Sequence, residues 1–169
     1  MKSIVLLLLS LFLIAQCAEP ESQSPPVEPP PQGPVDPGNS SGEKLTLYLF
    51  SAPWCESCNQ ELPEVNRILR GQIRSVLDRL SVQVHVVSGK TPAQPATQKV
   101  ADEYKASLGF SYDFIADRFC KFYRKFYDAA NCEIPAAVVT RQNGDVLRAF
   151  TPGRFTPVEL TDFIKENLK

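Results

Sequence analysis

Residues 45–63 read LTLYLFSAPWCESCNQELP, and this stretch decides the fold. Its first seven residues, Leu45–Ser51, form an apolar run with the composition of a buried β-strand. Two cysteines follow, Cys55 and Cys58, and then apolar residues recur at helical spacing. These are Leu62, Val65, Ile68, Leu69, Ile73, Val76, Leu77 and Leu80. The stretch therefore predicts a strand that leads into an amphipathic helix, with both cysteines at the junction.

The rest of the chain alternates strand-like and helix-like patterns. The expected elements are a strand at Ser81–Ser88, a helix at Thr91–Leu108, a short strand at Tyr112–Ala116, a short helix at Arg118–Tyr127, strands at Ala136–Thr140 and Val146–Phe150, and a C-terminal helix after Thr156. Asn143-Gly144 predicts a hairpin between the last two strands, because both residues tolerate positive φ. Thr156 and Glu159 form a capping box. This order predicts an α/β fold class with a mixed central sheet flanked by helices.

The position of the two cysteines indicates redox chemistry. At the start of a helix, the backbone N–H groups lack partners within the helix and the helix dipole favours negative charge. We therefore expect Cys55 to be partly ionised and nucleophilic. Cys58 lies one turn further along, where we expect a more buried, resolving thiol. The same spacing also occurs in zinc sites, so the pair alone is a moderate signal.

Further motifs make the sequence resemble the TlpA/ResA group of the thioredoxin-like superfamily. Residues 54–58 (WCESC), with Glu61 and Pro63 after them, resemble the WCxxCxxExP signature of that group. Ile134-Pro135, directly before an apolar run, resembles its cis-proline loop and the strand that follows. The resemblance covers residues 44–169 and implies a thioredoxin-like fold.

The resemblance also implies a reaction. Cys55 would attack a substrate disulfide, and Cys58 would resolve the mixed disulfide that results. Glu61 would move protons as thiol and thiolate interconvert, although a solvated helix charge is the alternative for this residue. The implied substrates are protein thiols and disulfides, handled together with an unidentified redox partner and without a cofactor or a metal.

Three residues are implied in substrate binding. Pro135, if cis, would bring the backbone of Ile134 beside the cysteines to bind an extended segment, and Trp54 would lie next to that segment. The alternatives are an ordinary loop proline at Pro135 and simple packing at Trp54.

The sequence departs from the family pattern at several positions. Ser57 replaces the proline common between the cysteines, and Glu56 adds a negative charge there. Leu49 occupies the place where thioredoxins carry a buried acid, so proton transfer would depend on Glu61. Residues 128–133 lack the pattern of dedicated cytochrome c maturation reductases, which weakens a role in haem attachment. The direction of the reaction, as reductant, oxidant or isomerase, therefore stays open.

A second pair of cysteines lies outside the signature. A disulfide between Cys120 and Cys132 would close a loop of about a dozen residues and stabilise the fold by roughly 3 kcal/mol. We expect a structural disulfide. A second redox pair that exchanges with the first, or two free thiols, are the alternatives.

The N-terminus resembles an export signal. Lys2 precedes Ile4–Ala15, a twelve-residue apolar run that is short for a membrane span and ends near Cys17. This pattern predicts a signal peptide at residues 1–17 whose Cys17 is lipidated, although Gln16 is unusual before such a cysteine. Cleavage by ordinary signal peptidase and an uncleaved anchor are the alternatives. All three predict a location outside the cytoplasm, either membrane-anchored facing the periplasm, with the outer membrane favoured, or soluble in the periplasm.

Residues 18–43 have the composition of a tether. They contain eight of the fifteen prolines and five acidic residues, but no basic residue. Such a segment cannot bury enough apolar surface to fold, so we expect an extended, disordered tether before a domain at residues 44–169. The domain has a small, scattered excess of basic residues, which argues against nucleic-acid binding.

Other functions were weighed against the oxidoreductase. A non-catalytic thioredoxin-like binding module with structural disulfides is the main alternative. A zinc site made of the four cysteines after Cys17 is disfavoured, because export favours disulfides. Copper delivery is disfavoured because Met1 and His85 are the only residues of their types, and we expect His85 to be an ordinary strand residue.

Overall fold

The computed structural model describes residues 43–72 and 74–169. The predicted signal peptide lies outside these residues, as does the predicted tether apart from Glu43. The carboxylate of Glu43 forms an ion pair with Arg141 at 2.8 Å. Among the described residues, no helix is long and apolar enough to cross a membrane.

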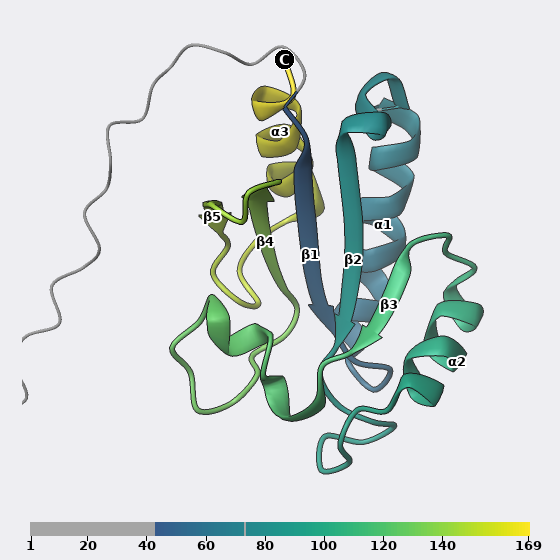
Figure 1. Ribbon diagram of the computed structural model, residues 1–169. Helices are drawn as coiled ribbons and strands as arrows, with labels where there is room; N and C mark the ends of the chain where they lie inside the picture. Colours follow the sequence, from purple (N-terminus) through teal and green to yellow (C-terminus); the bar gives the residue numbers. More distant parts are fainter. Residues whose placement is uncertain (1–42, 73) are drawn as a thin grey trace, which may run out of the picture. The chain divides into compact units, whose positions relative to one another are not determined.

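Five strands form one mixed sheet in this part of the chain (Figure 1). They are β1 (Leu45–Ser51), β2 (Leu80–Val86), β3 (Asp113–Ala116), β4 (Ala136–Arg141) and β5 (Val146–Ala149), in the order β3-β2-β1-β4-β5. β1 and β2 are parallel, as are β2 and β3, whereas β4 is antiparallel to both of its neighbours. The helices are α1 (Glu56–Gln72), α2 (Gln98–Leu108) and α3 (Pro157–Asn167), with short 3-10 helices η1 (Arg74–Arg79), η2 (Arg118–Cys120) and η3 (Tyr123–Lys125). The predicted α/β fold class, a mixed sheet flanked by helices, is confirmed.

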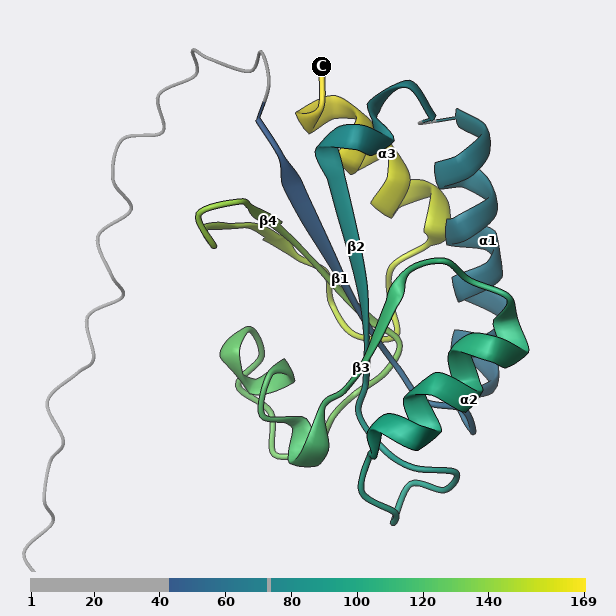
Figure 2. The same cartoon turned by 45° about the vertical axis from the view of Figure 1, so that its right-hand side comes forward.

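The central strand β1 shows how the two faces of the sheet differ. Successive side chains of a strand point to opposite faces. Leu45, Leu47 and Leu49 pack in the core with residues of α1, α2 and α3, while Tyr48 and Phe50 pack with residues 117–135. Figure 2 shows the three α-helices on one side of the sheet and the segment with η2 and η3 on the other. One face is therefore covered by helices and the other by an irregular segment.

The first predicted helix is wrong at its C-terminal end. The apolar spacing predicts a helix through Leu80, but α1 ends at Gln72 and η1 follows. Leu80 instead begins β2, where it is paired with Leu45 in register and is 8% exposed. Sheet pairing therefore determines the conformation of a residue whose sequence spacing also fits a helix.

The next two predicted helices also differ from those observed. α2 begins at Gln98 rather than Thr91, because the hydroxyl of Thr97 caps it by accepting the N–H of Val100 at 3.3 Å. The predicted helix at 118–127 is replaced by η2 and η3. Phe119 and Cys120 have φ values of 59° and 57°, which no α-helix accommodates.

The predicted hairpin and the predicted start of the C-terminal helix are confirmed. Gly144 has a φ of 94° in the turn between β4 and β5, which favours glycine there. The hydroxyl of Thr156 accepts the N–H of Glu159 at 3.1 Å, and Pro157 is the first residue of α3. The last strand pair and α3 therefore follow from local sequence signals.

Candidate functional site

Cys55 and Cys58 lie where β1 leads into α1, and they are joined as a disulfide with Cα atoms 5.2 Å apart. Cys55 directly precedes the first residue of α1. Its sulfur accepts the backbone N–H of Cys58 at 3.2 Å and lies 3.5 Å from the hydroxyl oxygen of Ser57. Cys55 is 5% exposed and Cys58 is fully buried. The Cys55 sulfur therefore sits among the unpaired donors of a helix start, which is an arrangement that stabilises a thiolate.

Trp54 holds the loop before the cysteines against β2. Its indole N–H donates to the Ser88 hydroxyl at 2.6 Å, two residues beyond the end of β2. The side chain of Trp54 is nevertheless 41% exposed. The indole is thus fixed in orientation while one part of it faces solvent directly next to Cys55.

Glu61, which lies in α1 one turn after Cys58, lines a small cavity. The cavity measures about 10 Å³, room for about one water molecule, and it is also lined by Leu49, Pro135 and Phe155. Oε2 of Glu61 is buried without a hydrogen-bond partner among the described residues. Burial raises the pKa of this carboxyl above its ordinary value. Glu61 therefore has the surroundings of a group that can hold a proton.

The Ile134–Pro135 peptide bond is cis, and it lies next to the end of β1. Ala136, the first residue of β4, is paired with Phe50, so the start of β4 lies beside the part of β1 that leads to Cys55. The Pro135 carbonyl accepts the N–H of Gly153 at 2.7 Å. Sheet register thus brings Ile134 and Pro135 to the same end of the sheet as Cys55.

Cys120 and Cys132 are joined as a second disulfide, with Cα atoms 6.2 Å apart. They are half-buried and pack against the hydrophobic cluster that contains Cys55 and Cys58. The buried members of this cluster are Phe50, Ala52, Cys55, Cys58, Val87, Tyr123, Ala136 and Val138. Both disulfides therefore adjoin one apolar cluster.

Asp117 organises the segment that carries the second disulfide. This residue is 4% exposed, and its carboxylate accepts the N–H groups of Phe122 and Tyr123, each at 2.8 Å. The sequence signal for this role was an aspartate directly after a strand pattern, which is a typical position for a helix cap.

His85 lies in β2 and is 4% exposed. Its ring stacks on Phe122 with centroids 4.1 Å apart, and neither ring nitrogen has a hydrogen-bond partner in the part of the chain that the structure describes. Burial lowers the pKa of His85 to about 4, so the ring is neutral at neutral pH.

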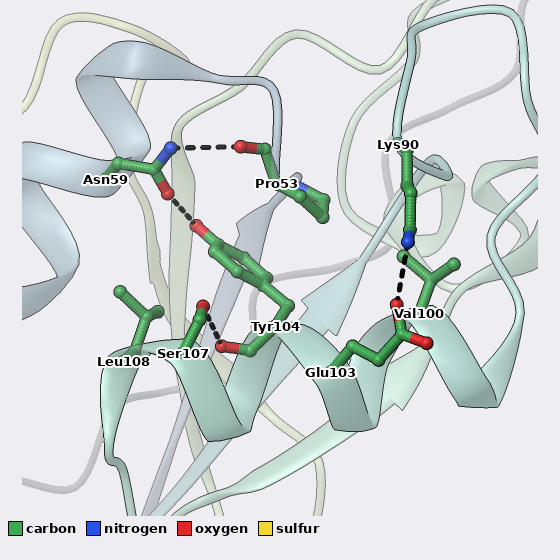
Figure 3. A pocket seen from close by; sticks show the side chains of 8 residues that line it. All are labelled: Pro53, Asn59, Lys90, Val100, Glu103, Tyr104, Ser107 and Leu108. Atoms are coloured by element: carbon green, nitrogen blue, oxygen red, sulfur yellow. Dashed lines mark hydrogen bonds and ion pairs between the residues drawn. The ribbon is translucent and has the colours of Figure 1, made fainter.

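A cavity of about 320 Å³ lies on the α2 side of the cysteine loop (Figure 3). Its walls include Pro53 and Asn59, which precede and follow the CxxC motif, and Tyr104 of α2. The Asn59 amide donates to the Pro53 carbonyl at 3.0 Å, and the Tyr104 hydroxyl donates to Asn59 at 2.6 Å (Figure 3). These contacts were not predicted from the sequence. Their only sequence signal was the position of Asn59 directly after Cys58.

No protein-family model matches this chain, and no curated protein matches it either. Solved structures do match. A thiol:disulfide interchange protein of the thioredoxin family from Chlorobium tepidum is 16% identical, with a TM-score of 0.57, and the match covers 75% of this chain and 81% of that chain. A secreted disulfide oxidoreductase from Mycobacterium tuberculosis, described as homologous to E. coli DsbE, is 14% identical, with a TM-score of 0.53 and coverage of 73% and 81%.

The exposed lipoprotein thioredoxin of Streptococcus pneumoniae is 21% identical, with a TM-score of 0.51, over 73% of this chain and 84% of that chain. At these identities the likeness establishes the fold and leaves activity to be argued from the site. The described part of the chain therefore has a thioredoxin-like fold.

Proposed function

We propose that this chain is a thiol–disulfide oxidoreductase of the TlpA/ResA type that acts on protein disulfides outside the cytoplasm. The observation that carries the proposal is the Cys55–Cys58 disulfide at the start of α1, with the Cys58 N–H directed at the Cys55 sulfur. A thioredoxin-like fold and a carboxyl group one helical turn after Cys58, that of Glu61, support it.

The reaction consists of two exchanges of sulfur partners. In the reduced protein, the Cys55 thiolate attacks one sulfur of a substrate disulfide, forms a mixed disulfide and releases the other substrate sulfur as a thiolate. The Cys58 thiolate then attacks the Cys55 sulfur, which forms the Cys55–Cys58 disulfide and releases the second substrate thiolate. Two electrons pass from the protein dithiol to the substrate. The same steps in reverse oxidise a substrate dithiol, and the reduction potential of the pair determines the direction.

Glu61 is proposed as the proton acceptor for Cys58. A resolving thiol must lose its proton before it attacks, and the fully buried Cys58 has no direct contact with solvent. The raised pKa of Glu61 brings this carboxyl closer to thiol values and makes it a better base. Glu61 would thus supply the proton-accepting carboxylate that thioredoxins carry at the position of Leu49.

The substrate segment is proposed to lie between Trp54 and the Ile134-Pro135 loop. Trp54 offers an exposed, oriented ring beside Cys55. Ile134 precedes the buried Pro135 at the same end of the sheet. A protein substrate would therefore meet apolar surface on two sides of the reacting sulfur.

Export and membrane anchoring are part of the proposal. The apolar run Ile4–Ala15 and the cysteine that follows support a lipid anchor at Cys17. Cys120 and Cys132 are proposed as a structural disulfide, which is consistent with an oxidising compartment.

Trapping experiments test the assigned roles of the two cysteines. With Cys58→Ser, Cys55 can attack but the mixed disulfide cannot be resolved, so stable covalent complexes with substrate proteins should accumulate on non-reducing gels. Cys55→Ser should trap few or none, because Cys58 is buried and lies further inside the helix. Equal trapping by the two variants would show that the roles are wrongly assigned, and trapping by neither would contradict the proposed activity.

A further inference from the structure

Four residues form a continuous chain of hydrogen bonds beside the CxxC loop. The Ser51 and Tyr104 hydroxyl oxygens are 3.0 Å apart, and the Tyr104 hydroxyl lies 2.6 Å from Oδ1 of Asn59. Nδ2 of Asn59 lies 3.0 Å from the Pro53 carbonyl oxygen. The chain joins the end of β1, helix α2, the first turn of α1 and the loop that carries the cysteines. Figure 3 shows its part from Tyr104 through Asn59 to Pro53.

The donors in this chain all point the same way. The Pro53 carbonyl can only accept, so the Asn59 amide nitrogen faces it and Oδ1 faces Tyr104. Because Oδ1 also only accepts, the Tyr104 hydroxyl donates to it, and the Ser51 hydroxyl then donates to the Tyr104 oxygen. Hydrogen bonds aligned in this way polarise and strengthen one another.

The inner part of the hydrogen-bond chain is buried. Ser51 is fully buried and Tyr104 is 5% exposed. Burial raises the pKa of Tyr104 above its ordinary value, so the hydroxyl keeps its proton and remains a donor. The outer member, Asn59, is exposed, and it is held in one orientation by contacts at both ends of its amide group.

Asn59 clamps the two ends of the loop that contains the cysteines. Its side chain bonds to Pro53, two residues before Cys55, and its own backbone N–H bonds to the Cys55 carbonyl at 3.0 Å. These two bonds fix the loop against the first turn of α1. That turn supplies the Cys58 N–H that contacts the Cys55 sulfur at 3.2 Å.

We propose that Tyr104 and Asn59 are positioning residues that tune the reactivity of the Cys55/Cys58 pair. The inference rests on the proposed function, since it assigns these residues to the same redox site. A hydrogen bond to an ionised thiolate is stronger than one to a disulfide sulfur. A fixed first turn therefore stabilises the reduced pair more than the oxidised pair, and loosening the turn favours the disulfide.

Tyr104→Phe is the main test, because it removes one hydroxyl and keeps the buried ring. In the reduced protein, alkylation of Cys55 at neutral pH should slow about three- to tenfold, the range expected from one lost hydrogen bond. The equilibrium constant for reduction of the disulfide by glutathione should fall by a similar factor, about three- to tenfold. Asn59→Ala should have the same effects, and because Asn59 is exposed this variant should remain folded.

Two further variants separate positioning from general destabilisation. Tyr112→Phe removes the hydroxyl of another half-buried tyrosine, whose ring contacts Phe110 away from the loop, and it should change neither measurement. The double variant Tyr104→Phe/Asn59→Ala should resemble the more severe single variant, because both changes break the same chain.

Specific results would overturn the inference. One is a folded Tyr104→Phe protein, with a thermal midpoint above the assay temperature, whose alkylation rate and glutathione equilibrium equal those of the wild type. Another is strict additivity in the double variant. Both measurements use small reagents and no protein substrate, so they stay informative if Cys58→Ser fails to trap substrates, a result that would count against the proposed function instead.

Discussion

Glu61 and Leu49 line the same small cavity, and Leu49 stands at the position where thioredoxins carry a buried acid. The sequence signature identified Glu61 because the residue stands three positions after Cys58. Its buried, unpartnered oxygen could not be predicted, since the cavity forms only where α1 packs against β1 and the Pro135 loop. Spacing along a helix gives the face on which a side chain lies, whereas burial depends on elements that are distant in sequence.

Glu61→Gln tests the proposed proton transfer. The substitution removes an ionisable group and keeps the shape of the side chain, so the fold should persist. The pH profile of dithiol oxidation should lose the contribution of a carboxyl with a raised pKa and should change below neutral pH. Stopped-flow kinetics from acid to neutral pH would measure the profile.

Glu64→Gln is the matched control for this experiment. Glu64 lies on the same helix, but it is exposed and paired with Arg67 at 2.5 Å. Its substitution should leave the profile unaltered. If Glu61→Gln and Glu64→Gln give the same profile as the wild type, Glu61 takes no part in proton transfer.

His85 should make the domain sensitive to acid. Its pKa falls from 6.5 to about 4 on folding, first because of burial; Asp117 raises the value and Lys125 lowers it. The folded state therefore binds this proton less readily than the unfolded state. The associated stability is fully present above pH 6.5 and is lost as pH falls towards 4. The full loss corresponds to about 3 kcal/mol.

His85→Phe tests this effect, because phenylalanine can keep the stack on Phe122. Urea unfolding at several pH values should show that the variant loses less stability than the wild type between pH 6.5 and 4. Parallel pH dependences for the two proteins would mean that His85 does not titrate in this way.

At the scale of elements, prediction from sequence was weakest for residues 117–135, the irregular segment that covers the sheet face opposite the α-helices. The aromatic spacing of residues 118–127 fits a helix, yet the chain forms two short 3-10 helices, the first of which contains two residues with positive φ, Phe119 and Cys120. Asp117 and the Cys120–Cys132 disulfide hold this path, and their partners are set by tertiary packing. The strands, the hairpin and α3 carry local signals, and the sequence located them to within one or two residues.

Removal of the second disulfide should destabilise the fold without abolishing the redox reaction. Cys120→Ala/Cys132→Ala opens a loop with a sequence separation of 12, which should lower the free energy of unfolding by about 3 kcal/mol. Urea unfolding in oxidising buffer measures this change, and oxidation of Cys55 and Cys58 by a small disulfide should persist. An unchanged stability together with slower turnover would instead identify a second redox pair.

At the scale of the whole molecule, the order of the elements followed from the sequence, but the order of the strands in the sheet did not. The resemblance to a known family supplied the expectation of a thioredoxin-like fold, which is confirmed for the described residues. Which strands lie at the centre depends on long-range pairing. β1 occupies that place with five of its seven residues buried, and its side chains pack on both faces of the sheet.

The proposed anchor can be tested in cells. Cys17→Ser removes the only thiol available for lipid near the N-terminal apolar run, so the protein should move from the membrane fraction to the soluble fraction. Fractionation followed by mass analysis of the wild-type N-terminus measures both location and acylation. A wild-type protein that is already soluble and carries no acyl mass would contradict the proposal.

The borders of the sheet have a consequence for a protein that is proposed to bind segments of other proteins during disulfide exchange. Both outermost strands, β3 and β5, are only four residues long. Exposed strand edges can recruit extended polypeptides by backbone pairing, and short edges limit this recruitment. Arg148 in the middle of β5 adds a charge there and pairs with Glu159 of α3. A substrate protein should therefore leave after disulfide exchange, because the domain offers it little length along which to become an additional strand and seed an aggregate.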